Sequence, residues 1–163
     1  FDPFPDGGGY PLKFVEWALD EMGCDDPTQV LHLCSGSMLT GTTVDIRPDT
    51  NPDIVADCRD VPLPDGSFDF VMADPPYSAE YAENLYGSGH AYPTPYQITR
   101  EASRLLRPGG KFGLMHTQVP PIRKPIRILG VYGITMGCGY AIRAWTLMEK
   151  GPQCPTSTST STP

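Results

Sequence analysis

The residues of this chain best suited to chemistry are Asp74, Pro75, Pro76 and Tyr77, which follow the apolar run Phe70 to Ala73. Such a run between turn residues is typical of a buried strand, so Asp74 is expected at the carboxyl end of a strand, where open α/β sheets bind ligands. Each proline fixes φ and lacks an N–H, which leaves stiff backbone with carbonyl acceptors. These acceptors suit a substrate amine, although the same residues could form only a rigid turn.

A second candidate site is the small-residue loop Cys34, Ser35 and Gly36, which follows the strand-like run from Gln29 to Leu33. A loop of this kind lets a nucleotide approach the backbone closely, and its N–H groups can hold a carboxylate or phosphate. One short loop does not by itself identify a nucleotide site.

Acidic residues end the next two strand-like segments. Asp45 closes the run that starts at Thr42, and Asp57 closes the run that starts at Asp53. Because the carboxyl ends of parallel strands meet at one edge of a sheet, we expect Asp45, Asp57 and Asp74 to share a site, although each alone could be a cap or turn former. An acid at the tip of the second strand can accept hydrogen bonds from ribose hydroxyls.

Helical patterns flank these strands. Apolar residues recur at helical spacing from Val15 to Met22 before Gly23, and Thr94 opens a capping box with Pro95 ahead of a second apolar face. We therefore expect helices near 11–22 and 94–107, and a short one over 78–85. The aromatic segment that includes Tyr81, Tyr86, His90 and Tyr92 could be a lid with stacking surfaces or a loop packed onto the core.

The C-terminal part predicts three more strands and a tail. Lys111 to His116 is typical of a buried fifth strand, and Ile126 to Ile134 with Tyr140 to Met148 predicts an antiparallel pair. Residues 151–163 are rich in Ser, Thr and Pro and are expected to be disordered, which leaves a single folded domain over 1–150.

The charge is unevenly divided. The net charge is -7, but residues 1–99 carry 17 acids and 3 bases, whereas residues 100–150 carry 2 acids and 9 bases. An acidic chain is a poor candidate for tight, unaided binding to nucleic acid, although the basic third could supply a phosphate-binding face or simply be solvated.

The cysteine pattern and the hydropathy of the chain predict the cellular compartment. The 5 cysteines form no CxxC pair, and His90 and His116 lack partners at metal-ligand spacing, so we expect reduced thiols and no metal. No stretch has the length of a membrane helix and the N-terminus does not resemble a signal peptide, which predicts a cytoplasmic protein.

The motifs together point to a family. The series LHLCSGS, VDIRP, VADCRDVPLPDGSFDFV, ADPPYS and EASRLLRPGGKFGLMH resembles the Rossmann-like (class I) S-adenosylmethionine-dependent methyltransferases. It resembles in particular the DPPY amino-methyltransferase branch, which modifies adenine N6 or cytosine N4 in DNA. The resemblance covers residues from about 10 to 150. It implies an α/β fold whose sheet has about seven strands and ends in an antiparallel hairpin.

The resemblance also implies a role for each site residue. Asp74, Pro75, Pro76 and Tyr77 would be catalytic, and Tyr77 would stack on the target base. S-adenosylmethionine would be the cofactor. The residues that would hold it are Cys34, Ser35 and Gly36 at the methionine moiety, Asp45 at the ribose, Asp57 and Cys58 at the adenine edge, Tyr10 and Pro11 near the carboxylate, and Asp74.

The chain departs from the family in its connections. Only eight residues separate Gly36 from Asp45, and the connections 46–52 and 118–125 are equally short. Because parallel strands usually need a crossover of about a dozen residues or more, several crossover helices should be missing. Part of the sheet would then be uncovered, which predicts a homodimer or a partner subunit.

The sequence thus predicts methyl transfer to an exocyclic amine of a nucleic-acid base, with adenine in DNA as the first candidate. An amine of RNA or of a free nucleotide is the alternative substrate, and no target-recognition domain is evident. A different class also stays open, in which the chain is a non-catalytic cofactor-binding subunit of a larger complex.

Overall fold

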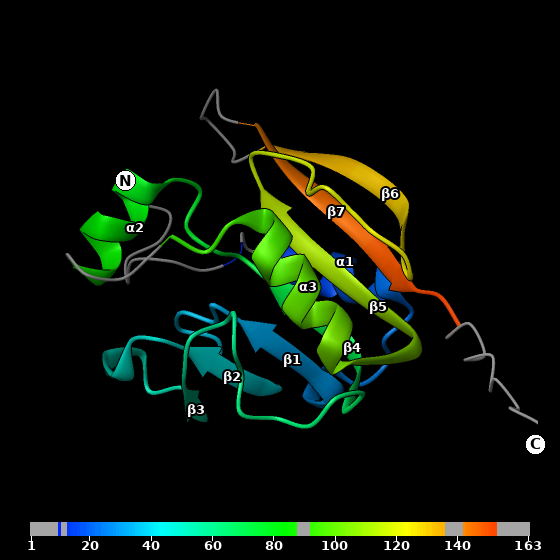
Figure 1. Cartoon of the computed structure of the whole chain (residues 1–163), viewed down its shortest axis with the longest axis horizontal. Helices are drawn as coiled ribbons and strands as arrows, with labels where there is room; N and C mark the ends of the chain where they lie inside the picture. Colours follow the sequence, from blue (N-terminus) through cyan, green and yellow to red (C-terminus); the bar gives the residue numbers. More distant parts are fainter. Residues whose placement is uncertain (1–9, 11–12, 88–91, 136–141, 153–163) are drawn as a thin grey trace, which may run out of the picture.

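The computed structural model describes residues 10, 13–87, 92–135 and 142–152, so residues 153–163 of the tail predicted over 151–163 lie outside the described range. Its centre is a seven-stranded sheet in the order β3-β2-β1-β4-β5-β7-β6 (Figure 1). The strands are β1 Val30–Leu33, β2 Thr42–Asp45, β3 Ile54–Val55, β4 Phe68–Ala73, β5 Leu106–His116, β6 Ile126–Thr135 and β7 Ile142–Lys150. The first five are parallel and β7 is antiparallel to both neighbours, which confirms the predicted Rossmann-like methyltransferase sheet and hairpin.

Among the described residues, one helix covers each face of the sheet (Figure 1). Helix α1, Phe14–Met22, ends at Gly23, whose φ of 68° turns the chain so that the N–H of Cys24 donates to the carbonyl of Leu19. The buried face of α1 packs on Met72, Met115 and other apolar side chains of the sheet. The predicted helix near 11–22 is thus confirmed from residue 14 onward, and 11–12 lie outside the described range.

Helix α3, Pro95–Leu105, covers the opposite face. Its start is the predicted capping box, in which Thr94 Oγ1 accepts from the N–H of Gln97 while Gln97 reaches back to the N–H of Thr94. The helix ends at Leu105 rather than at residue 107, because the chain enters β5 at Leu106 and pairs there with β4.

Short connections replace the missing crossover helices, as predicted. The segment 34–41 between β1 and β2 is described throughout and contains no helix. A 3-10 turn, η2 Pro48–Thr50, lies between β2 and β3. A second 3-10 turn, η1 Pro27–Gln29, precedes β1. The strand expected over Asp53 to Asp57 is only two residues long, so Asp57 lies beyond its end. Helix α2, Ala79–Tyr86, begins after Ser78, whose side chain accepts from the N–H of Tyr81.

Two charged residues of α3 hold the connection between β3 and β4. Arg104 donates to the carbonyls of Val61 and Leu63 and pairs with Asp65 at 2.7 Å. The buried carboxylate of Glu101 accepts from the N–H of Val61 and from Arg104. These bonds satisfy the backbone of a segment that no described crossover helix covers.

The C-terminal hairpin leaves apolar side chains exposed. Ile128, Leu129, Val131 and Ile142 of β6 and β7 are exposed, the last by 66%. In the described residues, no helix is long and apolar enough to cross a membrane.

The indole ring of Trp145 in β7 packs against Gly113 in β5 and leaves no room there for a side chain. A Cβ at Gly113 would lie 1.8 Å from the indole ring, which is fully buried. We expect Gly113→Ala to lower the free energy of unfolding by about 1–3 kcal/mol through overpacking. Gly133→Ala in β6, where a Cβ would lie 3.7 Å from Ile142, should stay within about 1 kcal/mol of wild type. Urea unfolding measures both, and equal stabilities would contradict the packing argument.

Candidate active site

The strand directions bring the predicted site residues to one edge of the sheet. Asp45 is the last residue of β2, Asp74 follows the end of β4, and the loop from Cys34 follows the end of β1. These parallel strands point to the same side, where α2 also lies (Figure 1). Asp57, two residues past β3, belongs to the same edge, whereas Pro11 lies outside the described residues.

The carboxylate of Asp45 binds backbone on both sides of it. Its Oδ2 accepts from the N–H of Gly36 at 2.8 Å, and its Oδ1 accepts from the N–H of Arg47 at 2.9 Å. Asp45 is 3% exposed, so these bonds form in a region with little water. A carboxylate has about four lone-pair sites, so two remain for hydroxyl groups of a ligand.

The loop between β1 and β2 depends on residues in the left-handed region. Cys34 and Gly36 have φ of 54° and 52°, and Gly41 has φ of 85°. A Cβ at Gly41 would lie 2.4 Å from the carbonyl oxygen of Val30, so the returning chain fits only without a side chain. Gly41 was not predicted from the sequence, where its only signal is a glycine just before a β-branched run.

Two buried polar atoms in or beside this loop have no hydrogen-bond partner in the described structure. They are the phenol oxygen of Tyr10 and Oγ of Ser35. Burial, and then the nearby groups of Asp74 and Cys34, raise the pKa of Tyr10 well above its usual value, so the phenol stays protonated and can donate. Orphaned polar atoms of this kind are expected where a polar ligand binds. The residues present therefore fit a bound cofactor.

Cys34 and Cys58 form a thiol pair at the same edge. The hydrogen bond to Cys58, and then burial, raise the pKa of the Cys34 thiol well above its usual value, so it stays neutral. Cys58 is buried in the core beside the α3 face. Asp57 is held by Arg59 in an ion pair of 2.5 Å. The side chains of Asp57 and Cys58 are thus already engaged, by Arg59 and Cys34 respectively.

Asp74 and Tyr77 interact directly. The phenol of Tyr77 donates to Oδ1 of Asp74 at 2.5 Å, and Pro75 and Pro76 between them are buried. Burial raises the pKa of Asp74 to about 6, although the Tyr77 hydrogen bond and the charge of Arg143 act in the opposite direction. Burial and the Asp74 carboxylate raise the pKa of Tyr77, so this phenol remains a donor.

The ring of Tyr77 already has aromatic and cationic neighbours. Tyr81 of α2 stacks on it with centroids 6.1 Å apart, His116 meets it edge-on at 5.5 Å, and the guanidinium carbon of Arg143 lies 4.6 Å from its centroid. A base that stacked on Tyr77, as the resemblance implies, would have to displace Tyr81 or Arg143 from the ring. Arg143 was not predicted from the sequence, because it lies in β7, far along the chain.

A hydrogen-bond chain holds the Tyr77 backbone. The N–H of Gln118 donates to Nδ1 of His116 at 3.1 Å, so the ring proton of neutral His116 is on Nε2, which lies 3.1 Å from the Tyr92 oxygen. The Tyr92 hydroxyl then donates to the carbonyl of Tyr77 at 3.4 Å. Burial lowers the pKa of His116, which favours this neutral form. Of the predicted lid aromatics, Tyr92 thus packs onto the core, and His90 lies outside the described residues.

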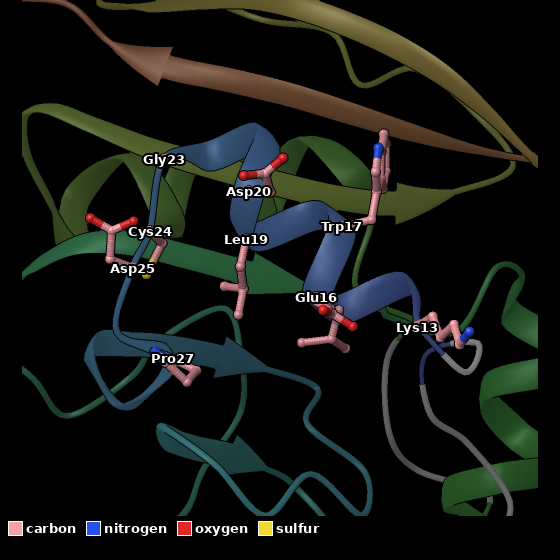
Figure 2. Close-up of a pocket in the computed structure, with 10 residues that line it drawn as sticks. Lys13, Glu16, Trp17, Leu19, Asp20, Gly23, Cys24, Asp25 and Pro27 are labelled. Carbon is pink, nitrogen blue, oxygen red and sulfur yellow. The ribbon is translucent and has the colours of Figure 1, made fainter.

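A hollow of about 730 Å³ lies beside α1 (Figure 2). It is lined by Trp17 and Leu19 and by the acids Glu16, Asp20 and Asp25, but by none of the predicted site residues. Its acidic lining disfavours an anionic ligand such as a nucleotide. The carboxyl edge of the strands therefore remains the candidate site.

A known domain family matches this sequence. The family model described as "Methyltransferase domain" matches residues 23–114, more than half of the chain. The 27-O-demethylrifamycin SV methyltransferase of Amycolatopsis mediterranei (strain S699) is 28% identical over 123 residues, which cover 66% of this chain and 40% of that protein. This chain therefore spans less than half the length of that curated relative.

Two solved structures show the same fold. TrmN from Thermus thermophilus has a TM-score of 0.64 at 18% identity, covering 90% of this chain and 52% of that chain. A SAM dependent methyltransferase from Aquifex aeolicus has a TM-score of 0.54 at 16% identity, covering 91% and 99%. The two likenesses show that the fold is that of class I methyltransferases. The match over residues 23–114 shows that the chain belongs to the methyltransferase domain family, whose cofactor is S-adenosylmethionine.

Proposed function

We propose that this protein transfers a methyl group to an exocyclic amine of a nucleic-acid base, with adenine in DNA as the leading substrate. The observation that carries the proposal is the Asp74 carboxylate at the end of β4, held by the Tyr77 phenol at 2.5 Å. The site offers a hydrogen-bond acceptor beside a loop with orphaned polar atoms. An acceptor at that place suits a substrate that brings N–H groups.

Asp74 and the Pro75 carbonyl act by accepting hydrogen bonds from the amine. An aromatic amine is a poor nucleophile because its lone pair is delocalised into the ring. Two acceptors that bind both N–H groups favour the tetrahedral nitrogen whose lone pair is free to attack. The Tyr77 phenol occupies one lone-pair site of Asp74, and the remaining sites are available to the amine. Positioning and electrostatics thus supply the rate enhancement.

The remaining residues bind and orient. S-adenosylmethionine, when bound, supplies an electrophilic methyl group. Asp45 would hold the ribose with its two remaining lone-pair sites, and Ser35 and Tyr10 would donate to the methionine moiety. A base in a duplex would have to leave the stack to reach Asp74, and a single-stranded target avoids that cost.

An amine of RNA or of a nucleotide is the alternative substrate, and a cofactor-binding subunit without activity is the alternative of another class. A panel of DNA, RNA and nucleosides incubated with labelled S-adenosylmethionine, followed by mass analysis of the product, separates these substrates. Titration calorimetry with the cofactor tests the non-catalytic alternative, which predicts cofactor binding without turnover on any member of the panel.

Replacing Asp74 should separate transfer from cofactor binding. We expect Asp74→Ala to reduce kcat by about 100-fold or more, because the amine loses its carboxylate acceptor. Cofactor affinity, measured by calorimetry, should stay close to wild type. Asp69→Ala is the matched control, since Asp69 is an exposed acid in β4, the strand that Asp74 follows, and it pairs with Arg107. Full turnover by Asp74→Ala would refute the proposed mechanism.

The pH dependence should report the Asp74 carboxylate. Only the ionised form accepts hydrogen bonds with both oxygens, and its pKa is about 6. We therefore expect kcat to fall by about tenfold per pH unit below pH 6. Tyr77→Phe keeps the ring but removes a hydrogen bond that lowers this pKa, so the acidic limb should move to higher pH. A limb that stays in place in Tyr77→Phe would exclude Asp74 as the titrating group.

We also propose that the exposed hairpin residues mediate self-association or binding of a partner subunit. Ile128, Leu129, Val131 and Ile142 form the supporting observation, because exposed apolar side chains gathered on one hairpin are typical of interfaces. Sedimentation velocity at micromolar protein should detect a homodimer that Val131→Lys converts to monomer. A wild-type monomer that also retains no partner on co-purification would contradict this proposal.

A further inference from the structure

A small hollow lies between α3 and the segment 121–126, away from the predicted site residues. Its volume is about 200 Å³, and its lining includes Tyr96, Arg100 and Ser103 of α3 with Arg123 and Lys124 of the segment. The guanidinium of Arg123 lies over the Tyr96 ring at 5.5 Å, which fixes the segment beside the helix. In Figure 1, α3 lies in front of the sheet, on the face opposite α1.

The charge of this hollow is unusual for the chain. Three cations line it and no carboxylate does, although the chain has 19 acids and 12 bases. Within the described ranges, Arg100, Arg123 and Lys124 have no carboxylate partner, and the neighbouring acid, Glu101, is buried and bound to Arg104 instead. Other arginines are neutralised by ion pairs, namely Arg47, Arg59, Arg104, Arg107 and Arg127.

Like charges gathered in one hollow repel each other unless an anion is bound. Arginine forks and the lysine ammonium suit the oxygens of a phosphate group, and the Ser103 hydroxyl adds a further donor. The volume corresponds to roughly six or seven water molecules. It is large enough for a phosphate with part of its sugar, and too small for a drug-sized ligand.

The helix that lines the hollow begins close to the candidate active site. Helix α3 starts at Pro95, soon after Tyr92, whose hydroxyl contacts the Tyr77 carbonyl. From Pro95 to Ser103 the helix advances about 12 Å, at about 1.5 Å per residue. A polynucleotide strand with one base at Asp74 could therefore place a phosphate of a nearby nucleotide in the hollow.

We propose that this hollow binds a backbone phosphate of the nucleic-acid strand that carries the target amine. The inference rests on the proposed function and names the part of the substrate that the basic third of the chain recognises. It places the phosphate contact on Arg100, Arg123 and Lys124, outside the residues that bind the cofactor or the amine.

The test compares two double variants that change the net charge equally. Arg100→Gln with Lys124→Gln removes two cations of the hollow, whereas Arg107→Gln with Arg127→Gln removes two ion-paired cations elsewhere. The probe is a fluorescein-labelled single-stranded DNA of about 12 nucleotides, followed by anisotropy over a range of salt concentrations. We expect the hollow variant to lose affinity by roughly tenfold or more. Its salt slope should fall by about 0.7 per lost contact, and the control should match wild type.

Equal affinity and salt slope in the hollow variant and wild type would overturn the inference. A second result would also overturn the inference: the wild-type protein binds inorganic phosphate in calorimetry but does not bind the oligonucleotide. The hollow would then be a site for free phosphate. The proposed function is tested separately by mass analysis of the bases. Binding through the hollow without any methylated base would refute the function alone, and methylation with binding independent of the hollow would refute the inference alone.

Discussion

The site depends on the two hydrogen bonds that the buried Asp45 carboxylate accepts. One bond comes from the N–H of Gly36, in the loop after β1, and the other from the N–H of Arg47, just after β2. The connection 34–41 between these strands contains no helix. Bonds from backbone N–H groups to a desolvated carboxylate are strong, so one side chain sets the relative position of two strand ends. The loop between these two strand ends includes Cys34 and Gly41, which both have positive φ.

Polar contacts replace the missing helices elsewhere as well. Arg104 and Glu101 bind the backbone of the β3–β4 connection, and His116 with Tyr92 holds the carbonyl of Tyr77. In each case a side chain satisfies backbone groups of an irregular segment. The chain thus keeps the carboxyl edge ordered although, in its described part, one helix covers each face of the sheet.

The fold places some of the acidic and basic residues at different sites on the domain. Two acids of the first part, Asp45 and Asp74, lie at strand ends in the candidate site, and three others, Glu16, Asp20 and Asp25, line the hollow beside α1. The basic third supplies Arg143 next to Tyr77 and the cations beside α3. Acceptors for an amine and donors for an anion are therefore both available on one small domain.

The sequence by itself located the strands, the two main helices and the acids Asp45 and Asp74 at strand ends, because hydrophobic periodicity, capping residues and turn residues are local signals. It placed Asp57 at the end of a longer third strand, whereas β3 has only two residues and Asp57 lies beyond it. It also predicted the missing crossovers, since connection length can be counted. It could not predict that Arg143 and His116 lie against Tyr77, that Gly41 fits against Val30, or that α3 ends at Leu105. Those facts depend on strand register and on contacts between residues far apart in the chain, which only tertiary packing decides.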